Sequence, residues 1–109
     1  MASRLPKLTE AQFTRQVLEL AKVFGWRTMH QRPARTAKGW RTAVQGDGVG
    51  WPDLVLVRGG RLIFAELKVG NRGLTPMQAV WLDALDRVGA DVYVWRPENW
   101  DLIERTLRP

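Results

Sequence analysis

The feature that most constrains this chain is the stretch from Gly50 to Lys68, which predicts a β-hairpin. Two runs rich in branched apolar residues, 54–57 and 62–67, flank the pair Gly59-Gly60. Glycine readily adopts the positive φ that a tight hairpin turn requires. The two runs are therefore expected to pair as neighbouring antiparallel strands.

The register of this hairpin places acidic residues together. With both glycines in the turn, counting outward sets Asp53 directly opposite Glu66, whereas a turn of three residues would shift that pairing. Directly opposed residues have Cβ atoms about 4.5 to 5.5 Å apart, and like charges there are destabilising. Lys68 projects from the same strand face as Glu66, because side chains alternate along a strand. Two carboxylates and an ammonium suit a hard divalent cation beside a phosphate.

Composition limits the classes of protein and of metal site. A chain of 109 residues is expected to form one domain, spanning 1–109. Its 17 Lys and Arg against 11 Asp and Glu give a net charge of +6, which fits a nucleic-acid binder, a basic membrane-surface protein or a protein that assembles with an acidic partner. With no cysteine and one histidine, a metal must have oxygen ligands, as magnesium, manganese and calcium do. No apolar run suits a signal peptide or a membrane span, so we expect a cytoplasmic protein.

A first helix is predicted over residues 9–24. Thr9 and Gln12 form a capping box, and Gly25 stands where helices commonly end. Glu10 projects within the angular range of the apolar stripe of this helix. It is therefore a candidate site residue, although a first-turn carboxylate also suits the helix dipole without any functional role. The stripe consists of Phe13, Val17, Leu20, Ala21 and Phe24.

Residues 26–31 predict a short strand, and His30 at its end is either a phosphate contact or a hydrogen-bonded bystander. The segment 31–50 that follows has little apolar content, although Trp40–Val44 suits a small extra strand. We interpret the segment as a basic arm over the acidic site, the alternative being an ordinary solvated loop. Its basic residues before Asp47 are Arg32, Arg35, Lys38 and Arg41.

A second helix is predicted to begin at Pro76 after the cap Thr75 and to end before Gly89. Gln78 completes a capping box with Thr75, which is a sufficient structural reason for a glutamine at this position. The apolar stripe expected to pack on the sheet consists of Met77, Trp81, Ala84, Leu85 and Val88. Residues 91–95 then predict a strand, and Pro97 begins a short closing helix. The order α-β-β-β-α-β predicts an α/β fold with a mixed sheet flanked by helices.

The candidate site residues come from different elements, and metal-assisted phosphodiester hydrolysis would use them all. Carboxylates hold the cations that activate water, and a lysine stabilises the charge that develops on the phosphate. Each residue also has an ordinary explanation, such as an ion pair between Glu66 and Lys68 on one strand face. A glutamate inside an otherwise apolar strand nevertheless runs against strand propensity.

The chain resembles the PD-(D/E)XK nuclease superfamily, and within it the VRR-NUC branch found in phages and in structure-specific repair nucleases. The resemblance spans about Thr9 to Trp95, and the predicted element order is similar to the restriction-endonuclease-like core of that superfamily. The basic segment 31–50 matches no motif of that branch. The matching motifs are Gly50-Trp51-Pro52-Asp53-Leu54, Glu66-Leu67-Lys68, Leu74-Thr75-Pro76-Met77-Gln78 and Trp81-Leu82.

This resemblance implies a role for each matching residue. Asp53, Glu66 and the Leu67 carbonyl would bind Mg²⁺ or Mn²⁺, and Lys68 would be the catalytic lysine. Glu10 would be the acidic residue of the first helix, also at the metal, and Gln78 an active-site residue of the second helix. From charge we expect DNA contacts from Arg32, Arg35, Lys38, Arg41 and Arg72.

The resemblance further implies a homodimer that cuts branched or junction DNA in a bacterial or phage-infected cell. The leading hypothesis from sequence is therefore a metal-dependent, structure-selective endodeoxyribonuclease. A non-catalytic nucleic-acid-binding module is the alternative, since an α-β-β-β-α run also occurs in double-stranded-RNA-binding domains. A basic assembly protein that binds no nucleic acid is a third possibility.

Overall fold

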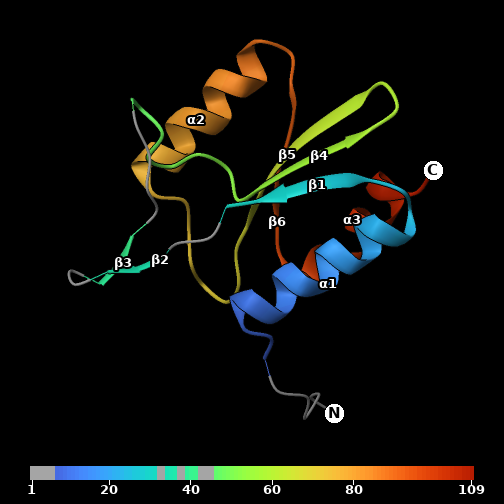
Figure 1. The fold of residues 1–109 in the computed structure, drawn as a ribbon, viewed down its shortest axis with the longest axis horizontal. Coiled ribbons are helices and arrows are strands. Elements are labelled where there is room, and N and C mark those ends of the chain that lie inside the picture. The colour runs from blue at the N-terminus through green and yellow to red at the C-terminus, as the bar shows by residue number, and fades with distance from the viewer. Residues whose placement is uncertain (1–6, 32–33, 37–38, 42–45) are drawn as a thin grey trace.

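The computed structural model describes residues 7–31, 34–36, 39–41 and 46–109. Within these residues the protein has an α/β fold, with a four-stranded mixed sheet and three α-helices (Figure 1). The elements in chain order are α1 (Glu10–Val23), β1 (Arg27–His30), β2 (Ala34–Thr36), β3 (Gly39–Arg41), β4 (Leu54–Arg58), β5 (Arg61–Leu67), α2 (Pro76–Arg87), β6 (Asp91–Trp95), the 3₁₀ helix η1 (Pro97–Asn99) and α3 (Trp100–Leu107).

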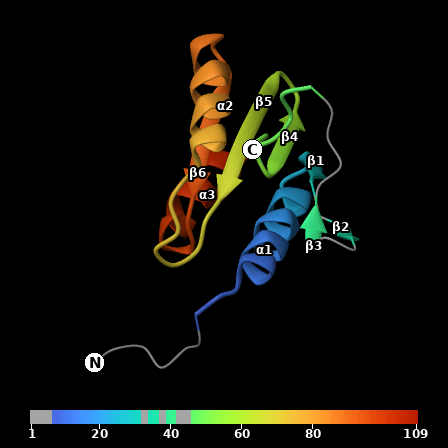
Figure 2. The ribbon, with the colours of Figure 1, turned by 90° about the vertical axis from the view of Figure 1, so that its left-hand side faces the viewer.

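The main sheet has the strand order β1-β4-β5-β6. β1, β4 and β5 are successively antiparallel, whereas β5 and β6 are parallel. Parallel neighbours need a crossover connection, and α2 supplies it. The strands β2 and β3 form a separate antiparallel ribbon, which Figure 2 shows on the side of the β4–β5 hairpin opposite α2.

The hairpin has the register that its glycine turn predicts. Arg58 pairs with Arg61, the pairing continues to Leu54 opposite Ala65, and Gly59 has a φ of 57°. Asp53 precedes the last pair and Glu66 follows it, so the two acidic residues stand at matched positions. The hairpin register that a three-residue turn would have shifted is therefore confirmed.

One face of the sheet carries the hydrophobic core. Helices α1 and α3 cover this face, while α2 lies on the other side of the sheet (Figure 1). Phe64 projects to the α2 side, where its ring contacts Trp51, and Trp51 in turn contacts Trp81 of α2. The core cluster consists of Phe13, Val17, Ala21, Trp26, Leu54, Leu56, Ile63, Ala65, Leu67, Trp95, Ile103 and Leu107.

Both predicted helix starts are confirmed. The side chains of Thr9 and Thr75 accept hydrogen bonds from the backbone N–H of Gln12 and Gln78, and both capping boxes are complete. The predicted stripe of α2 is only partly right, because Met77 is 44% and Val88 80% exposed, whereas Leu82 is buried. The helix packs mainly over β6, and the side chains of Met77 and Val88 near its two ends stay largely exposed.

The segment 31–50 is described in part. Its expected small strand begins at Trp40 within β3, and residues 42–45 lie outside the described residues. Arg32 and Lys38 also lie outside them, while Arg35 and Arg41 are placed as backbone positions of the ribbon. No helix in the described part of the chain is long and apolar enough to cross a membrane.

Candidate active site

Glu66 is a buried carboxylate within a strand of the main sheet. Its neighbours Ala65 and Leu67 point into the hydrophobic core, so strand alternation directs Glu66 to the opposite face. Glu66 is 1% exposed, and Lys68, which follows on the same face, is 7% exposed. Burial of both charged side chains requires compensating polar contacts.

Gln78 provides those contacts from the first turn of α2. The Lys68 Nζ donates a hydrogen bond of 2.8 Å to Gln78 Oε1, and Gln78 Nε2 donates one of 2.8 Å to Glu66 Oε2. Lys68 Nζ also lies 3.6 Å from Glu66 Oε2. One amide therefore bridges the two charged groups.

The same amide caps α2. Gln78 Oε1 accepts a 2.9 Å hydrogen bond from the backbone N–H of Thr75, whose hydroxyl oxygen accepts one of 3.2 Å from the Gln78 N–H. The structural and the functional explanations of Gln78 are thus compatible. The capping box holds the amide in the orientation that reaches Lys68 and Glu66.

Asp53 is held at the open end of the hairpin. Its Oδ2 accepts a 2.9 Å hydrogen bond from the backbone N–H of Leu67, and its carbonyl accepts one of 3.1 Å from the N–H of Gln31. The Asp53 side chain is consequently tied to the strand that carries Glu66.

The electrostatics of Glu66 follow from this arrangement. The pKa of its carboxyl is raised from 4.5 to about 8, first by burial and then by the negative charge of the adjacent Asp53, while Lys68 acts in the opposite direction. The Oε1 atom of Glu66 is buried and has no hydrogen-bond partner. A buried carboxylate oxygen without a donor, beside a second carboxylate, is a position that a cation would stabilise.

The chemistry of this cluster fits a divalent metal with oxygen ligands. Asp53 and Glu66 are the acidic residues that would hold it. Among the described residues, no three His, Cys, Asp or Glu side chains come together as a metal-binding group. A cation held by Asp53 and Glu66 alone would have to keep several waters, as magnesium usually does.

The loop before Asp53 packs tightly against the start of α2. Gly50 has a φ of 88°, and a Cβ at this position would lie 2.5 Å from the Met77 carbonyl carbon and 2.8 Å from the Gln78 nitrogen. Trp81 Nε1 also donates a 2.7 Å hydrogen bond to the Asp47 carbonyl. These contacts fix the loop that carries Asp53 relative to Gln78.

Glu10 forms an ion pair with Arg72. Its Oε2 is 3.8 Å from Arg72 Nη1, and the two side chains are 46% and 71% exposed respectively. Arg72 belongs to the loop between Lys68 and α2. The structure thus brings together Asp53, Glu66, Lys68 and Gln78 of the expected site, and pairs Glu10 with an arginine at its edge.

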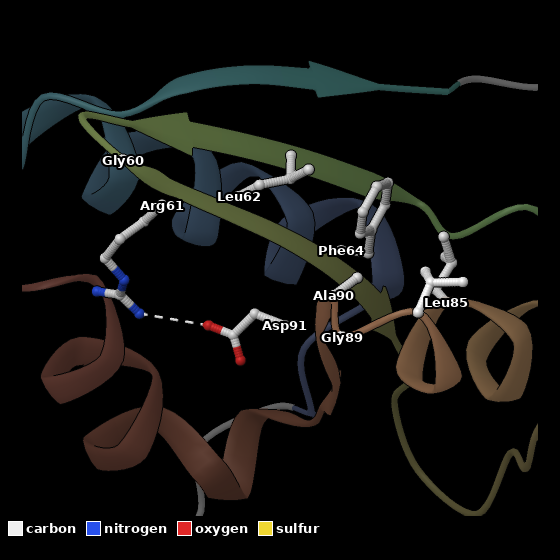
Figure 3. A pocket seen from close by; sticks show the side chains of 9 residues that line it. Gly60, Arg61, Leu62, Phe64, Leu85, Gly89, Ala90 and Asp91 are labelled. Atoms are coloured by element: carbon white, nitrogen blue, oxygen red, sulfur yellow. Dashed lines mark ion pairs between the residues drawn. The ribbon is translucent and has the colours of Figure 1, made fainter.

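A hollow of about 610 Å³ lies between the hairpin and the segment that joins α2 to β6 (Figure 3). An ion pair of 3.5 Å between Arg61 and Asp91 stands at its edge. Within the described residues, none of the four clustered side chains lines the hollow. Its lining consists of Gly60, Arg61, Leu62, Phe64, Leu85, Val88, Gly89, Ala90 and Asp91.

Comparison with known proteins adds no family to these observations. No model of a known protein family matches the chain, and no curated protein matches it significantly.

Proposed function

We propose that this protein is a Mg²⁺- or Mn²⁺-dependent DNA endonuclease that hydrolyses phosphodiester bonds. The observation that carries the proposal is the buried Glu66, held by Lys68 and Gln78 beside Asp53, with one carboxylate oxygen left without a partner. An ordinary structural ion pair gives no reason for leaving that oxygen unsatisfied. A metal ligand gives one.

The raised pKa of Glu66 supports the same conclusion. Desolvation and the neighbouring Asp53 both disfavour the charged carboxylate, and Lys68 compensates only in part. Strongly shifted ionisable groups with a specific charged neighbour are typical of functional sites. A divalent cation between Asp53 and Glu66 would remove the repulsion that raises this pKa.

Each clustered residue then has a distinct task. Asp53 and Glu66 would hold the metal, and the resemblance adds the Leu67 carbonyl and Glu10. The bound metal would activate water and stabilise negative charge on the scissile phosphate. Lys68 would donate hydrogen bonds to the reacting phosphate or water, and Gln78 keeps its ammonium directed toward Glu66.

The wider features of the chain support DNA as the substrate. The net charge of +6 favours a polyanion, and the Pro52-Asp53 and Glu66-Leu67-Lys68 motifs resemble those of the VRR-NUC branch. By that resemblance we propose a restriction-endonuclease-like core and a cytoplasmic homodimer acting on branched DNA. Two subunits with one site each would cut two strands of a junction. Sedimentation that shows a monomer both with and without DNA would contradict the dimer.

The decisive assay is cleavage of labelled four-way junction, flap, single-stranded and linear duplex DNA, with and without Mg²⁺ or Mn²⁺. Glu66→Gln should reduce the metal-dependent rate more than about 100-fold, since even outer-shell changes at metal sites cost about 10- to 100-fold. Glu19→Gln, the same chemical change on the exposed side of α1, should leave the rate unchanged. Equal rates for the two variants, or no cleavage by wild type in either metal, would refute the proposal.

A further inference from the structure

We propose that Arg96 is a positioning residue that fixes the loop of residues 69–73 and thereby presents Arg72 to a backbone phosphate of the bound strand. This inference rests on the proposed function, because it names a contact between the same site and DNA. It assigns to Arg96 a role that does not involve touching the substrate.

The side chain of Arg96, which directly follows β6, holds the loop of residues 69–73 by two hydrogen bonds. Its Nη1 donates a 3.1 Å hydrogen bond to the Gly70 carbonyl, and its Nη2 donates one of 2.6 Å to the Arg72 carbonyl. Its own backbone N–H donates a 2.9 Å hydrogen bond to Asn99 Oδ1, which anchors the arginine at the start of η1. The planar guanidinium has donors in a fixed fork, so that one side chain holds two carbonyl oxygens at a set spacing.

Val69 packs against the hydrophobic core, but the rest of this loop has few other contacts among the described residues. Its residues from 70 to 73 are all exposed, and the internal backbone hydrogen bond between the Arg72 N–H and the Val69 carbonyl is long, at 3.4 Å. Hydrogen bonds that involve an ionised partner are stronger than neutral ones. The two bonds from Arg96 are therefore the main restraint on the backbone of Arg72.

The side chain of Arg72 is available to a phosphate. It is 71% exposed, and its contact with the half-exposed Glu10 has an N–O distance of 3.8 Å. Such an exposed pair is weak and screened by salt, so a phosphate can replace the carboxylate. In the described part of the chain no acidic side chain forms an ion pair with Arg96. This edge therefore carries the guanidiniums of both Arg72 and Arg96.

The loop also begins at the candidate active site. The backbone N–H of Lys68 donates a 3.0 Å hydrogen bond to the carbonyl of Trp95, the residue directly before Arg96. Arg72 follows Lys68 by four residues. A strand whose scissile phosphate lies at Lys68 would thus meet Arg72 at a neighbouring phosphate, provided that Arg96 holds the loop in place.

The test is the affinity of a labelled four-way junction, measured by fluorescence anisotropy in EDTA for wild type, Arg72→Gln, Arg96→Gln, Arg96→Lys and the double Gln variant. Loss of one charge-assisted phosphate contact should weaken binding about tenfold, and Arg72→Gln should lower the salt slope by about one. Arg96→Gln should act through the same contact, so the double variant should bind about as well as Arg72→Gln alone. Arg87→Gln, an exposed charge change on α2, should stay within about twofold of wild type.

Arg96→Lys separates positioning from charge. Lysine keeps the charge but cannot bridge two carbonyls as a fork does, so it should bind as weakly as Arg96→Gln. Melting curves establish that the variants are folded, and Arg96→Lys carries the test if Arg96→Gln is not. Full rescue by lysine, or a loss of about a hundredfold in the double variant, would overturn the inference. If wild type binds the junction but does not cleave it, only the proposed nuclease activity is refuted. If wild type neither binds nor cleaves it, both proposals are refuted.

Discussion

Gly50→Ala tests how tightly the loop that carries Asp53 is held against α2. The new Cβ would lie 2.5 Å from the Met77 carbonyl carbon, where the obstacle is backbone rather than a flexible side chain. Residue 50 also has a φ of 88°, which costs an alanine about 1 to 2 kcal/mol. Relief of the overlap costs about 1 to 3 kcal/mol more, so the free energy of unfolding should fall by about 2 to 5 kcal/mol.

Gly46→Ala is the matched control. Gly46 has a φ of 66°, yet a Cβ there would meet no atom of the described residues within 4 Å. The free energy of unfolding of Gly46→Ala should therefore fall only by the backbone cost of about 1 to 2 kcal/mol. Urea denaturation of both variants measures the difference, which is the steric contribution. Equal losses would refute the close packing of Gly50 on the first turn of α2, and with it the fixed spacing between Asp53 and Gln78.

Three further predictions concern buried polar groups. In metal-free buffer the free energy of unfolding should fall by at most about 5 kcal/mol as pH rises from 4.5 to about 8, because folded protein keeps a proton on Glu66 that unfolded protein has lost. Urea denaturation of Glu66→Gln should lack this slope, and parallel pH curves would contradict the raised pKa. Gln78→Glu keeps an oxygen that can cap α2 but places a second carboxylate against Glu66. It should therefore lower the melting temperature more at alkaline than at acidic pH. An equal decrease at both pH values would count against the contact between residues 78 and 66. Trp26→Phe removes the 2.7 Å hydrogen bond from Nε1 to the Leu107 carbonyl and should cost about 1 to 3 kcal/mol in denaturant unfolding, whereas no change would show that this bond contributes nothing.

The features that the sequence predicts correctly depend on residues close together in the chain. The turn at Gly59 sets the register that places Asp53 and Glu66 at matched positions. The capping boxes at Thr9 and Thr75 set both helix starts. Turn and cap chemistry is local, so sequence spacing is sufficient to predict it.

The features that the sequence missed depend on how distant elements pack. The spacing of apolar residues in α2 does not predict that the Met77 side chain is largely exposed or that Gly50 lies against the backbone of Met77. Likewise, the angular position of Glu10 on its helix does not say which loop meets the first turn, and the structure puts Arg72 there. Glycine directly before the Trp51-Pro52-Asp53 run was the available signal for a close approach.

The most direct test of the central claim is the Mg²⁺-dependent cleavage rate of a labelled four-way junction by Asp53→Asn and Asp83→Asn. Both changes remove one carboxylate charge, but Asp53 lies beside Glu66 whereas Asp83 is exposed on α2 and pairs with Arg87. We expect Asp83→Asn to cleave at the wild-type rate and Asp53→Asn to lose more than about 100-fold. Equal cleavage by the two variants would contradict the proposal that Asp53 and Glu66 form a metal-dependent nuclease site.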